Sequence, residues 1–464
     1  MKRSGFRMNR RQFASQVTAG TVVAAAGTSL AGATRKDGTL LAGAAETVAT
    51  PTPKGTFLIG PMKPSTGVHD DLHARALILA SGEERIAIVT LDYLGFDFAY
   101  TNELVKAASR AAGIPVGNVL LNCSHTHSAP LTAPSGPWKE QQGQPFYKML
   151  PRKIAEVVKR AADKLQPAAL RYRREPTQIG FNRRLLHRDQ IVMAPNPAGA
   201  VLPWVDVLAV DATDGRSIAV LFSHAAHPVI VHEASTLISA DYPGFAVQHL
   251  KRTRSKDTVY MFAQGCCGNI NGFPLKGGID AAQAAGRDLA EAVSRALEHK
   301  SPALDSSVIR STALELELPL QPPPSVEECR SRLAEEQRPD RRQRFAELLA
   351  IAESGQTRTM RMPIHALRLG DFCLLAMAHE PFAEYHQFVN DICPFSGNMV
   401  LAYTNGLECY VGTQKDYELG ERGGYETSPR GAAFMFDSRL PLSAASEELL
   451  KAGLRRTIDS LQRV

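Results

Sequence analysis

Three familiar catalytic motifs are absent from the sequence. Its 464 residues contain no Gly-x-Ser-x-Gly nucleophile elbow, no phosphate-binding P-loop and no His-Glu-x-x-His zinc motif. These absences argue against a serine hydrolase of the nucleophile-elbow type, a P-loop enzyme and a zincin peptidase. A catalytic site would therefore have to be assembled from residues that lie far apart in the sequence.

The excess of positive over negative side chains is also small. The formal net charge is only +6, and part of it lies at the N-terminus, in Lys2, Arg3, Arg7, Arg10 and Arg11. No basic stripe with interleaved aromatic residues follows, so we do not expect a nucleic-acid partner. Beyond the N-terminus no segment offers about 20 continuous apolar residues, so we expect no transmembrane anchor in the mature protein.

Cysteines are few and irregularly spaced. The chain has 7, with no repeated Cys-x-x-Cys pair and with Cys266 and Cys267 adjacent. We therefore predict no disulfide framework, although a single bridge remains open in an oxidising compartment. Hydrophobic residues make up 44% and charged residues 22% of the chain, which is ordinary for a globular protein.

The N-terminus is expected to be an export signal. Residues 9–13, Asn-Arg-Arg-Gln-Phe, resemble a twin-arginine signal, and a weakly apolar stretch follows as far as Leu30. Residues 31–33 and 42–44, both Ala-Gly-Ala, are cleavage candidates. A membrane anchor is the alternative, but the stretch is rich in Ala, Gly, Thr and Ser. We predict a signal peptide at 1–33, a linker at 34–54, a catalytic domain at 55–464 and a periplasmic or extracellular location.

Strand-like and helix-like patterns alternate through residues 55–464. The expected hairpins join residues 75–79 to 85–91, 205–210 to 218–222, and 360–367 to 372–377. Expected helices cover residues 102–112, 154–165, the charged stretch 325–354 with a break at Pro339, and 444–461. The mixture predicts an α/β (mixed α+β) fold with central β-sheets flanked by helices.

Histidines gather after two of the predicted strands. Residues 124–128 are Ser-His-Thr-His-Ser and follow the strand 119–123, while His224 and His227 follow the strand 218–222. Residues two apart on an extended segment face the same way, so His125 and His127 can point into one site. One imidazole can bind a metal while the other binds substrate or moves a proton, and paired structural histidines are the alternative. His224 and His232 are interpreted as packing or surface residues.

A carboxylate and a group of tyrosines follow later strands. Glu380 comes after the apolar run 372–377, and four of the 11 tyrosines lie between Tyr403 and Tyr425, Tyr410 among them. A carboxylate at a strand end can be a third metal ligand, and a phenolate can bind Zn²⁺. The alternatives are a glutamate in the first turn of a helix and tyrosines that only pack.

Taken together and in order, these clusters resemble the N-terminal catalytic domain of the neutral (alkaline, non-lysosomal) ceramidases. The resemblance covers roughly residues 55–440. It is carried by residues 67–70 with 74–76, 122–130, 180–183, 227–244, 262–271, Glu380 and 410–413. The ordered set is far more specific than any one of these segments.

The resemblance implies a ligand set and a substrate site. It implies one Zn²⁺ ion held by His125, His227, Glu380 and Tyr410. It further implies that His127, Arg183 and Tyr425 surround a substrate amide, with Arg183 holding an anion or carbonyl and Tyr425 donating to the oxyanion. Asn182 belongs to the same matched segment as Arg183 and is assigned to substrate binding. Asp241 would orient a histidine or the backbone.

The sequence departs from the family at the nucleophile. The family's serine falls on Asn271, and no serine lies between Gln264 and Phe273. We therefore expect water activated by Zn²⁺, which can lower the pKa of water to about 7, with His127 taking or returning a proton. Asn271 would position the substrate or polarise its carbonyl. We also expect a short family member without the C-terminal immunoglobulin-like domain.

Three functions remain open at this point. The first is a zinc hydrolase that cleaves an amide in an N-acyl, ceramide-like compound, so that the partner is a lipid or other small molecule. The second keeps the metal and acts on a glycoconjugate or other carbohydrate by hydrolysis or elimination, since a fold and a metal site do not fix the substrate. The third is a non-catalytic exported binding protein.

Overall fold

The computed structural model describes residues 39–132, 143–299, 301–305, 309–435 and 438–462. Contacts divide the chain into Met1–Ala33 and Thr34–Val464, and the fold below is that of the second unit. The predicted signal peptide at 1–33 lies outside the described residues. Among the described helices none is long and apolar enough to cross a membrane.

An eight-stranded sheet forms the centre of the fold, in the order β15-β13-β12-β8-β1-β5-β6-β7. Its strands are β1 (Leu41–Val48), β5 (His73–Ser81), β6 (Glu84–Leu91), β7 (Val119–Cys123), β8 (Gln166–Pro176), β12 (Trp204–Ala212), β13 (Ser217–His224) and β15 (Val259–Gln264). Neighbours are antiparallel except at the two edges, where β13 pairs with β15 and β6 with β7 in parallel. Parallel pairing at each edge directs several strand ends toward the same side of the sheet.

A four-stranded sheet lies against the larger one. Its order is β17-β18-β19-β21, with β17 (Ile309–Pro319), β18 (Thr359–Leu369), β19 (Phe372–Met377) and β21 (Gly397–Leu401). Two-stranded pairs complete the sheets: β2 (Phe57–Leu58) with β3 (Lys63–Pro64), β4 (Gly67–Val68) with β14 (Leu237–Ile238), β9 (Gly180–Asn182) with β16 (Ile270–Gly272), β10 (Arg184–His187) with β11 (Gln190–Met193), and β20 (Glu380–Pro381) with β22 (Tyr410–Val411).

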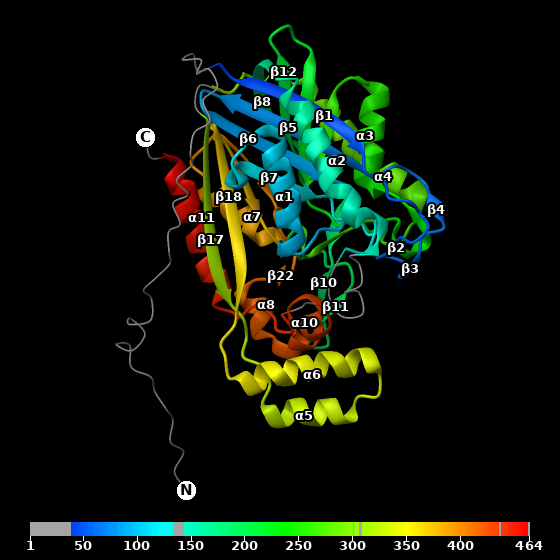
Figure 1. Cartoon of the computed structure of the whole chain (residues 1–464). Coiled ribbons are helices and arrows are strands. Elements are labelled where there is room, and N and C mark those ends of the chain that lie inside the picture. Colours follow the sequence, from blue (N-terminus) through cyan, green and yellow to red (C-terminus); the bar gives the residue numbers. More distant parts are fainter. Residues whose placement is uncertain (1–38, 133–142, 300, 306–308, 436–437, 463–464) are drawn as a thin grey trace. The chain divides into compact units, whose positions relative to one another are not determined.

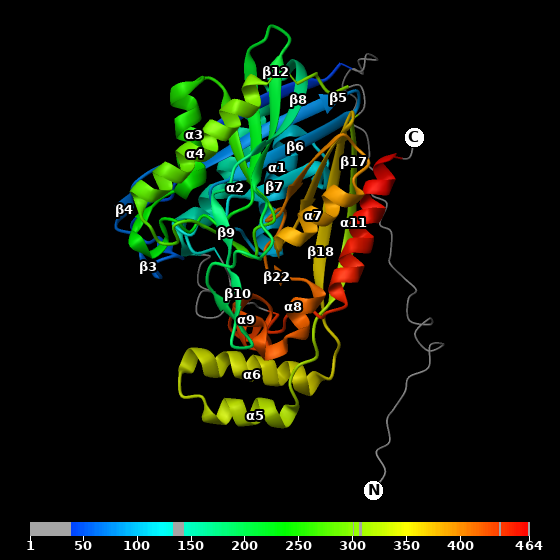
Figure 2. The same cartoon turned by 180° about the vertical axis from the view of Figure 1, so that it is seen from behind.

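Helices cover the outer faces of both sheets (Figures 1 and 2). The helices are α1 (Phe98–Ala112), α2 (Pro145–Ala162), α3 (Asp241–Thr253), α4 (Ile279–Glu298), α5 (Val326–Glu335), α6 (Pro339–Ser354), α7 (Ala383–Ile392), α8 (Gln414–Glu418), α9 (Gly424–Thr427), α10 (Pro429–Met435) and α11 (Ser446–Gln462). Helices α2, α3 and α4 pack on the large sheet, with α1 against α2, while α7 and α11 pack on the small sheet. The hairpin of α5 and α6 lies below α8–α10 in both views.

Side-chain alternation explains this layering. On β5, Ala76 and Ile78 join the core beneath α1 and α2, whereas Leu77 and Leu79 join the core shared with the small sheet. On β19, Leu374 faces that shared core and Leu375 packs toward the other side, with α11. Strands buried on both faces have continuous apolar runs, which is why these segments look uniformly hydrophobic in the sequence.

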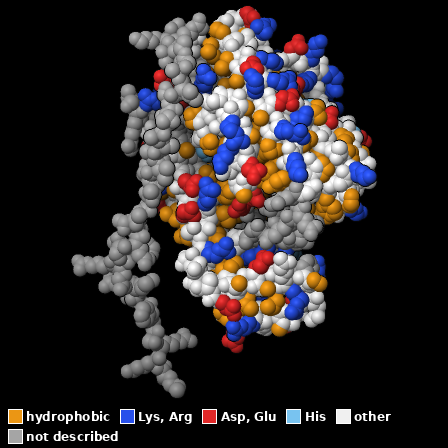
Figure 3. Space-filling model, viewed as in Figure 1, with side chains coloured by type: hydrophobic (Ala, Val, Ile, Leu, Met, Phe, Trp, Pro, Cys, Tyr) orange, Lys and Arg blue, Asp and Glu red, His pale blue; other side chains and the backbone are white. Residues whose placement is uncertain are grey.

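Most of the expected elements are confirmed, and the fold class is confirmed. The three hairpins are β5–β6, β12–β13 and β18–β19, and the charged stretch 325–354 forms α5 and α6 with Pro339 as the first residue of α6. On the face shown in Figure 3, Lys and Arg side chains are interspersed with Asp and Glu. This face carries no patch of a single charge sign among the residues that are coloured there.

The predicted linker at 34–54 is described from residue 39 onward, and for this part the prediction is wrong. Strand β1 occupies much of this segment and pairs with β5 and β8 inside the large sheet. The small residues that suggested a linker are needed for close packing, because a Cβ on Gly43 would lie 2.2 Å from the carbonyl oxygen of Ala161 in α2. Cleavage after Ala44 would cut β1 in two, so the fold is incompatible with that cleavage candidate.

The two edges of the large sheet come together at one end. The side chain of Asn122 in β7 bonds to backbone groups that a neighbouring strand would otherwise pair with. Its Oδ1 accepts from the backbone N–H of Gln264 in β15 at 2.8 Å. Its Nδ2 donates to the carbonyl oxygens of Gln264 and Ala402 at 3.3 and 2.6 Å. Asn122 is fully buried. This amide therefore joins β7, β15 and the end of β21 at the place where the histidine segments begin.

Candidate metal centre and active site

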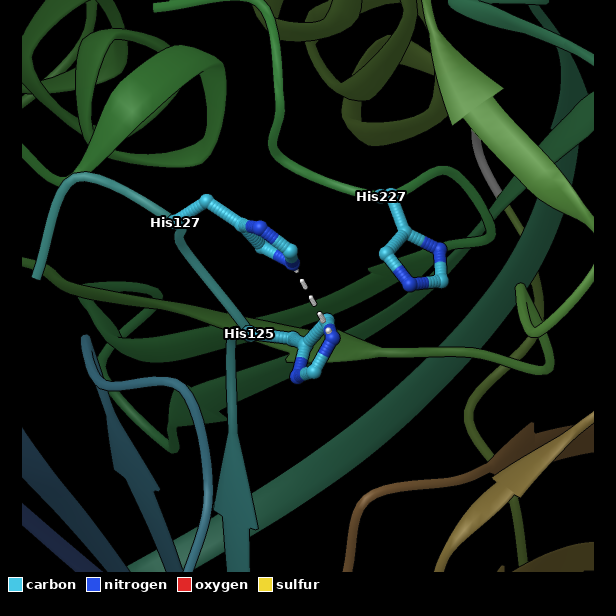
Figure 4. A group of neighbouring side chains, drawn as sticks. All are labelled: His125, His127 and His227. Carbon is cyan, nitrogen blue, oxygen red and sulfur yellow. Dashed lines mark hydrogen bonds between the residues drawn. The ribbon is translucent and has the colours of Figure 1, made fainter. Parts of the chain in front are cut away.

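Three histidines converge where these strands end (Figure 4). His125 and His127 follow β7 and His227 follows β13, and the ring nitrogens that they offer all lie within 4.8 Å of one another. His125 adopts a left-handed backbone conformation, with φ of 68°, which turns its side chain toward His227. The sequence prediction that His125 and His127 face one site is confirmed.

Hydrogen bonds fix which nitrogen each ring presents. Nδ1 of His125 lies 2.6 Å from the carbonyl oxygen of Leu94, and Nδ1 of His227 lies 2.8 Å from that of Cys267. A carbonyl oxygen can only accept, so each Nδ1 carries the proton and each Nε2 carries a lone pair. Both Nε2 atoms are therefore available to a cation, and each ring is held by an Nδ1 hydrogen bond to a carbonyl oxygen, as metal-binding histidines commonly are.

Gln264 holds the two histidine segments in place. Its Nε2 donates to the backbone carbonyl oxygens of Ser124 and Ala226 at 2.8 and 3.1 Å. These are the residues immediately before His125 and His227. One side chain at the end of β15 thus fixes the spacing of two segments that are about a hundred residues apart in the sequence.

Glu380 completes the cluster from β20, which follows β19 of the small sheet along the chain. Its Oε2 lies 3.1 Å from Nε2 of His227 and 3.4 Å from Nε2 of His125. Strands β20 and β22 pair Glu380 with Tyr410, and the Tyr410 side chain hydrogen-bonds to the Glu380 carboxylate. Gly268 permits this approach, because a Cβ there would lie 2.3 Å from the carbonyl oxygen of Glu380.

The donor set fits a small divalent cation. Ligands bound tetrahedrally at the usual Zn–N and Zn–O lengths are separated by about 3.3 Å, which is close to the separations from Glu380 Oε2 to the two histidine nitrogens. Burial lowers the pKa of His125 to about 4 and that of His227 well below its ordinary value, so both rings are neutral near pH 7. Burial also raises the pKa of Glu380 and, strongly, that of Tyr410, and a cation would offset both effects.

His127 occupies a different position from the other two histidines. Its Nε2 lies 3.4 Å from Nε2 of His125, and its ring stacks on His232 with the centroids 5.3 Å apart. Burial and the three neighbouring imidazoles hold the pKa of His127 well below its ordinary value. His232 was interpreted as a packing or surface residue, and stacking on His127 gives it a place beside the site.

A buried ion-pair network lies next to Tyr410. Arg183 donates from Nε to Glu426 at 2.8 Å and from Nη1 to Oδ1 of Asn271 at 2.9 Å, while Arg184 bonds to the other oxygen of Glu426 at 2.5 Å. The Arg183 guanidinium lies 5.4 Å from the ring centre of Tyr410 and 6.0 Å from that of Tyr425. Since Asn271 accepts through Oδ1, its Nδ2 is left as a donor.

Asp241 and Asn182 form hydrogen bonds to backbone groups around the site. Asp241 accepts from the backbone N–H groups of Val231 and Tyr242 at 2.9 and 2.6 Å, which supports the backbone alternative of its predicted role. Asn182 donates to the carbonyl oxygen of Ala200 and accepts from the N–H of Arg184. None of the hydrogen bonds described for these two residues reaches a site histidine. The bonds that are described hold the backbone segments around the site in place.

Asp241 has a consequence for stability that a variant can test. Burial raises the pKa of its carboxyl to about 7 from an ordinary 3.8. Between these pH values the folded protein holds a proton that the unfolded chain has released, so the free energy of unfolding falls as pH rises from about 4 to about 7. Each pH unit of this interval corresponds to about 1.4 kcal/mol.

Asp241→Asn is expected to lack this pH dependence, because an amide does not ionise in this range. Asparagine also tolerates the φ of 55° found at this position. Denaturant unfolding at pH 5 and pH 8 should show the variant gaining stability relative to the wild type at the higher pH, on the order of 2–3 kcal/mol. An unchanged difference between the two proteins at both pH values would contradict the argument.

Three residues of the site have roles that the patterns did not indicate. Asn122 and Gln264 act through bonds to backbone groups of distant strands, for which no local pattern exists. Tyr403 donates to Glu380 at 3.2 Å and its ring lies 4.5 Å from that of His125. The concentration of tyrosines after residue 403 was the available signal for Tyr403.

Known proteins support the resemblance. Residues 60–274 match the family described as neutral/alkaline non-lysosomal ceramidase, N-terminal. A crystal structure of neutral ceramidase from Pseudomonas aeruginosa is similar with a TM-score of 0.69 at 19% identity, covering 92% of this chain and 75% of that chain. A structure described as ceramidase complexed with C2 gives a TM-score of 0.68 at 16% identity, covering 92% and 76%. Comparison with curated protein sequences gives no match.

The family match covers the segments that supply His125, His127, Arg183, His227 and Asn271. The likeness of fold covers 92% of the chain and so extends beyond the residues of the family match. A family of ceramidases implies a hydrolase. Residues 60–274 are similar to the N-terminal part of the neutral/alkaline non-lysosomal ceramidases, and the chain has the fold of neutral ceramidase.

Proposed function

We propose that this protein is a zinc-dependent amidohydrolase that cleaves the amide bond of an N-acyl, ceramide-like substrate. The observation that carries the proposal is the convergence of two histidine nitrogens on one carboxylate. Oε2 of Glu380 lies 3.1 Å from Nε2 of His227 and 3.4 Å from Nε2 of His125. His125, His227, Glu380 and Tyr410 would hold the ion. A bound Zn²⁺ supplies Lewis-acid polarisation of a carbonyl and makes water more acidic.

The residues around the cluster suit the steps of amide hydrolysis. His127 is neutral, lies within the cluster and can take a proton from water and return it to the leaving amine. Tyr425 and Nδ2 of Asn271, which has no hydrogen bond to a described residue, are donors to the carbonyl oxygen as it gains negative charge. Arg183 fixes the orientation of Asn271 and places a positive charge beside Tyr410 and Tyr425.

His127→Ala is expected to separate metal binding from catalysis. If His127 moves the proton and does not hold the ion, the variant keeps its zinc and loses roughly 10²–10⁴-fold in kcat. Zinc content by plasma mass spectrometry and kcat on the same preparation give the two values. A variant that loses its zinc would instead make His127 a ligand.

The nucleophile can be tested independently. Asn271 stands where an attacking serine would be needed, and its side chain is engaged with Arg183. We expect intact-protein mass spectrometry, after rapid acid quenching during turnover, to find no acyl group on the chain. A mass increase equal to the acyl group would rule out direct attack by water.

Turnover of a matched substrate panel tests the reaction class. The panel contains a fluorescent N-acyl sphingosine, an N-acylethanolamine with the same acyl chain and a set of glycosides. We expect release of fatty acid from the first two and no cleavage of the glycosides. Cleavage confined to the glycosides would favour the carbohydrate alternative, and zinc binding without any turnover would favour a binding protein.

A further inference from the structure

A cavity adjoins the site at Tyr425. It has a volume of 320 Å³ and lies between β11 and the segment that contains α9 and α10. Its lining includes Ile191, Arg422, Gly424, Tyr425 and Arg430. In Figures 1 and 2 these elements lie below the large sheet and above the α5–α6 hairpin.

Tyr425 connects this cavity to the metal cluster. It is 37% exposed, whereas His125, His227, Glu380 and Tyr410 are nearly or fully buried. Its side chain hydrogen-bonds to that of Tyr410, and the two rings lie 5.7 Å apart. Since Tyr410 in turn bonds to Glu380, the cavity is one side chain away from the cluster.

The cavity is positively charged. Arg422 and Arg430 line it, and among the described residues neither guanidinium is paired with a carboxylate. The one acidic residue of the lining, Glu421, has Oε1 3.9 Å from Nη2 of Arg332 in α5, so its charge is partly offset. Arg183 lies behind Tyr425, with its guanidinium 6.0 Å from the ring centre.

We propose that Arg422 and Arg430 bind an anionic group on the amine portion of the substrate, beside Tyr425. This proposal rests on the proposed amidohydrolase function and narrows its substrate class. The preferred substrate would be an N-acyl compound whose amine portion carries a carboxylate, sulfonate or phosphate. Uncharged sphingoid amines would be the poorer substrates.

The chemistry of the lining favours this class. Guanidinium groups form paired, charge-assisted hydrogen bonds with the oxygens of such anions. An uncharged amine portion would leave two arginines facing the substrate without a counter-charge and gain nothing from them. The positive charge of this cavity also raises the local concentration of an anionic substrate.

The test compares substrates with one acyl chain and different amine portions: N-dodecanoylglycine, N-dodecanoyltaurine and uncharged N-dodecanoylethanolamine. We expect the wild type to have at least a tenfold higher kcat/KM for the two anions. The double variant Arg422→Gln/Arg430→Gln should lose at least tenfold for the anions and stay within threefold for the ethanolamide. Arg287→Gln/Arg456→Gln, with the same change of charge on exposed positions of α4 and α11, is the control.

The possible results separate this proposal from the proposed function. Equal or better turnover of the ethanolamide, or an anion preference that survives in the double variant, overturns the proposal and leaves the amidohydrolase intact. If no amide is cleaved, the proposed function fails. Calorimetric titration of N-dodecanoylglycine into the wild type and the double variant then decides, because unchanged affinity overturns the anion site and an affinity at least tenfold weaker supports it.

Discussion

His125→Ala is expected to remove zinc from the protein and activity with it. The wild type should contain about one zinc ion per chain and the variant little or none, since an alanine cannot replace a buried ligand nitrogen. Loss of a mere hydrogen-bond partner of a ligand costs roughly 10–100-fold in affinity or activity, so loss of a ligand should cost more than roughly 10²-fold in kcat/KM. Plasma mass spectrometry and the N-acyl substrate assay measure the two effects.

His224→Gln provides the matched control for this variant. His224 is also buried, and its Nδ1 also bonds to a carbonyl oxygen, that of Trp204 at 2.7 Å. It lies in β13, three residues before His227, and its other nitrogen accepts from the backbone of Ile179. This variant should keep its zinc and most of its activity. Full zinc occupancy in His125→Ala would refute the ligand assignment.

Glu426→Gln is expected to have the largest effect on stability. Glu426 is 3% exposed and is the shared partner of Arg183 and Arg184. Replacing it leaves two buried guanidinium groups with less compensation, and breaking a buried pair in this way typically costs about 3–5 kcal/mol. The free energy of unfolding from urea denaturation at pH 7 should fall by this amount.

Glu426→Gln should also have lower activity than the wild type. Glu426 holds Arg183, and Arg183 in turn holds Asn271 and lies beneath Tyr425. Glu353→Gln is the control: Glu353 pairs with Arg330 at 2.7 Å, but both side chains are largely exposed, and such pairs contribute little. It should change the free energy of unfolding by less than about 1 kcal/mol. A comparably small change in Glu426→Gln would mean that the buried network does not stabilise the fold.

The sequence was sufficient where local chemistry decides the outcome. Alternation and turn residues located β5–β6, β12–β13 and β18–β19, and the capping of α1 by Asp97 and Gly113 follows ordinary rules. The ends of β7, β13 and β19 also placed His125, His227 and Glu380 as candidates for one site. The resemblance then selected the ligands among alternatives that the residues alone left open.

The sequence was insufficient where close packing or long-range bonding decides. Residues 42–45 are small, and the segment around them was predicted to be a linker, because the need for a Cβ-free position beside α2 is invisible without the helix. The pairing of Asn122 with the backbone of Gln264 joins strands from opposite edges of a sheet, and periodicity carries no information about it. The partnership of Glu426 with Arg183 and Arg184 likewise spans more than 240 residues.

The closure at Asn122 has a consequence for the order of events as the chain folds. His125 and His227 are brought together only when β7 approaches β15, and Glu380 arrives only when the small sheet has packed against the large one. Contacts of such long sequence separation form slowly, and a partly assembled chain offers an ion isolated ligands. Capture of the ion would therefore mark the completion of folding rather than its beginning.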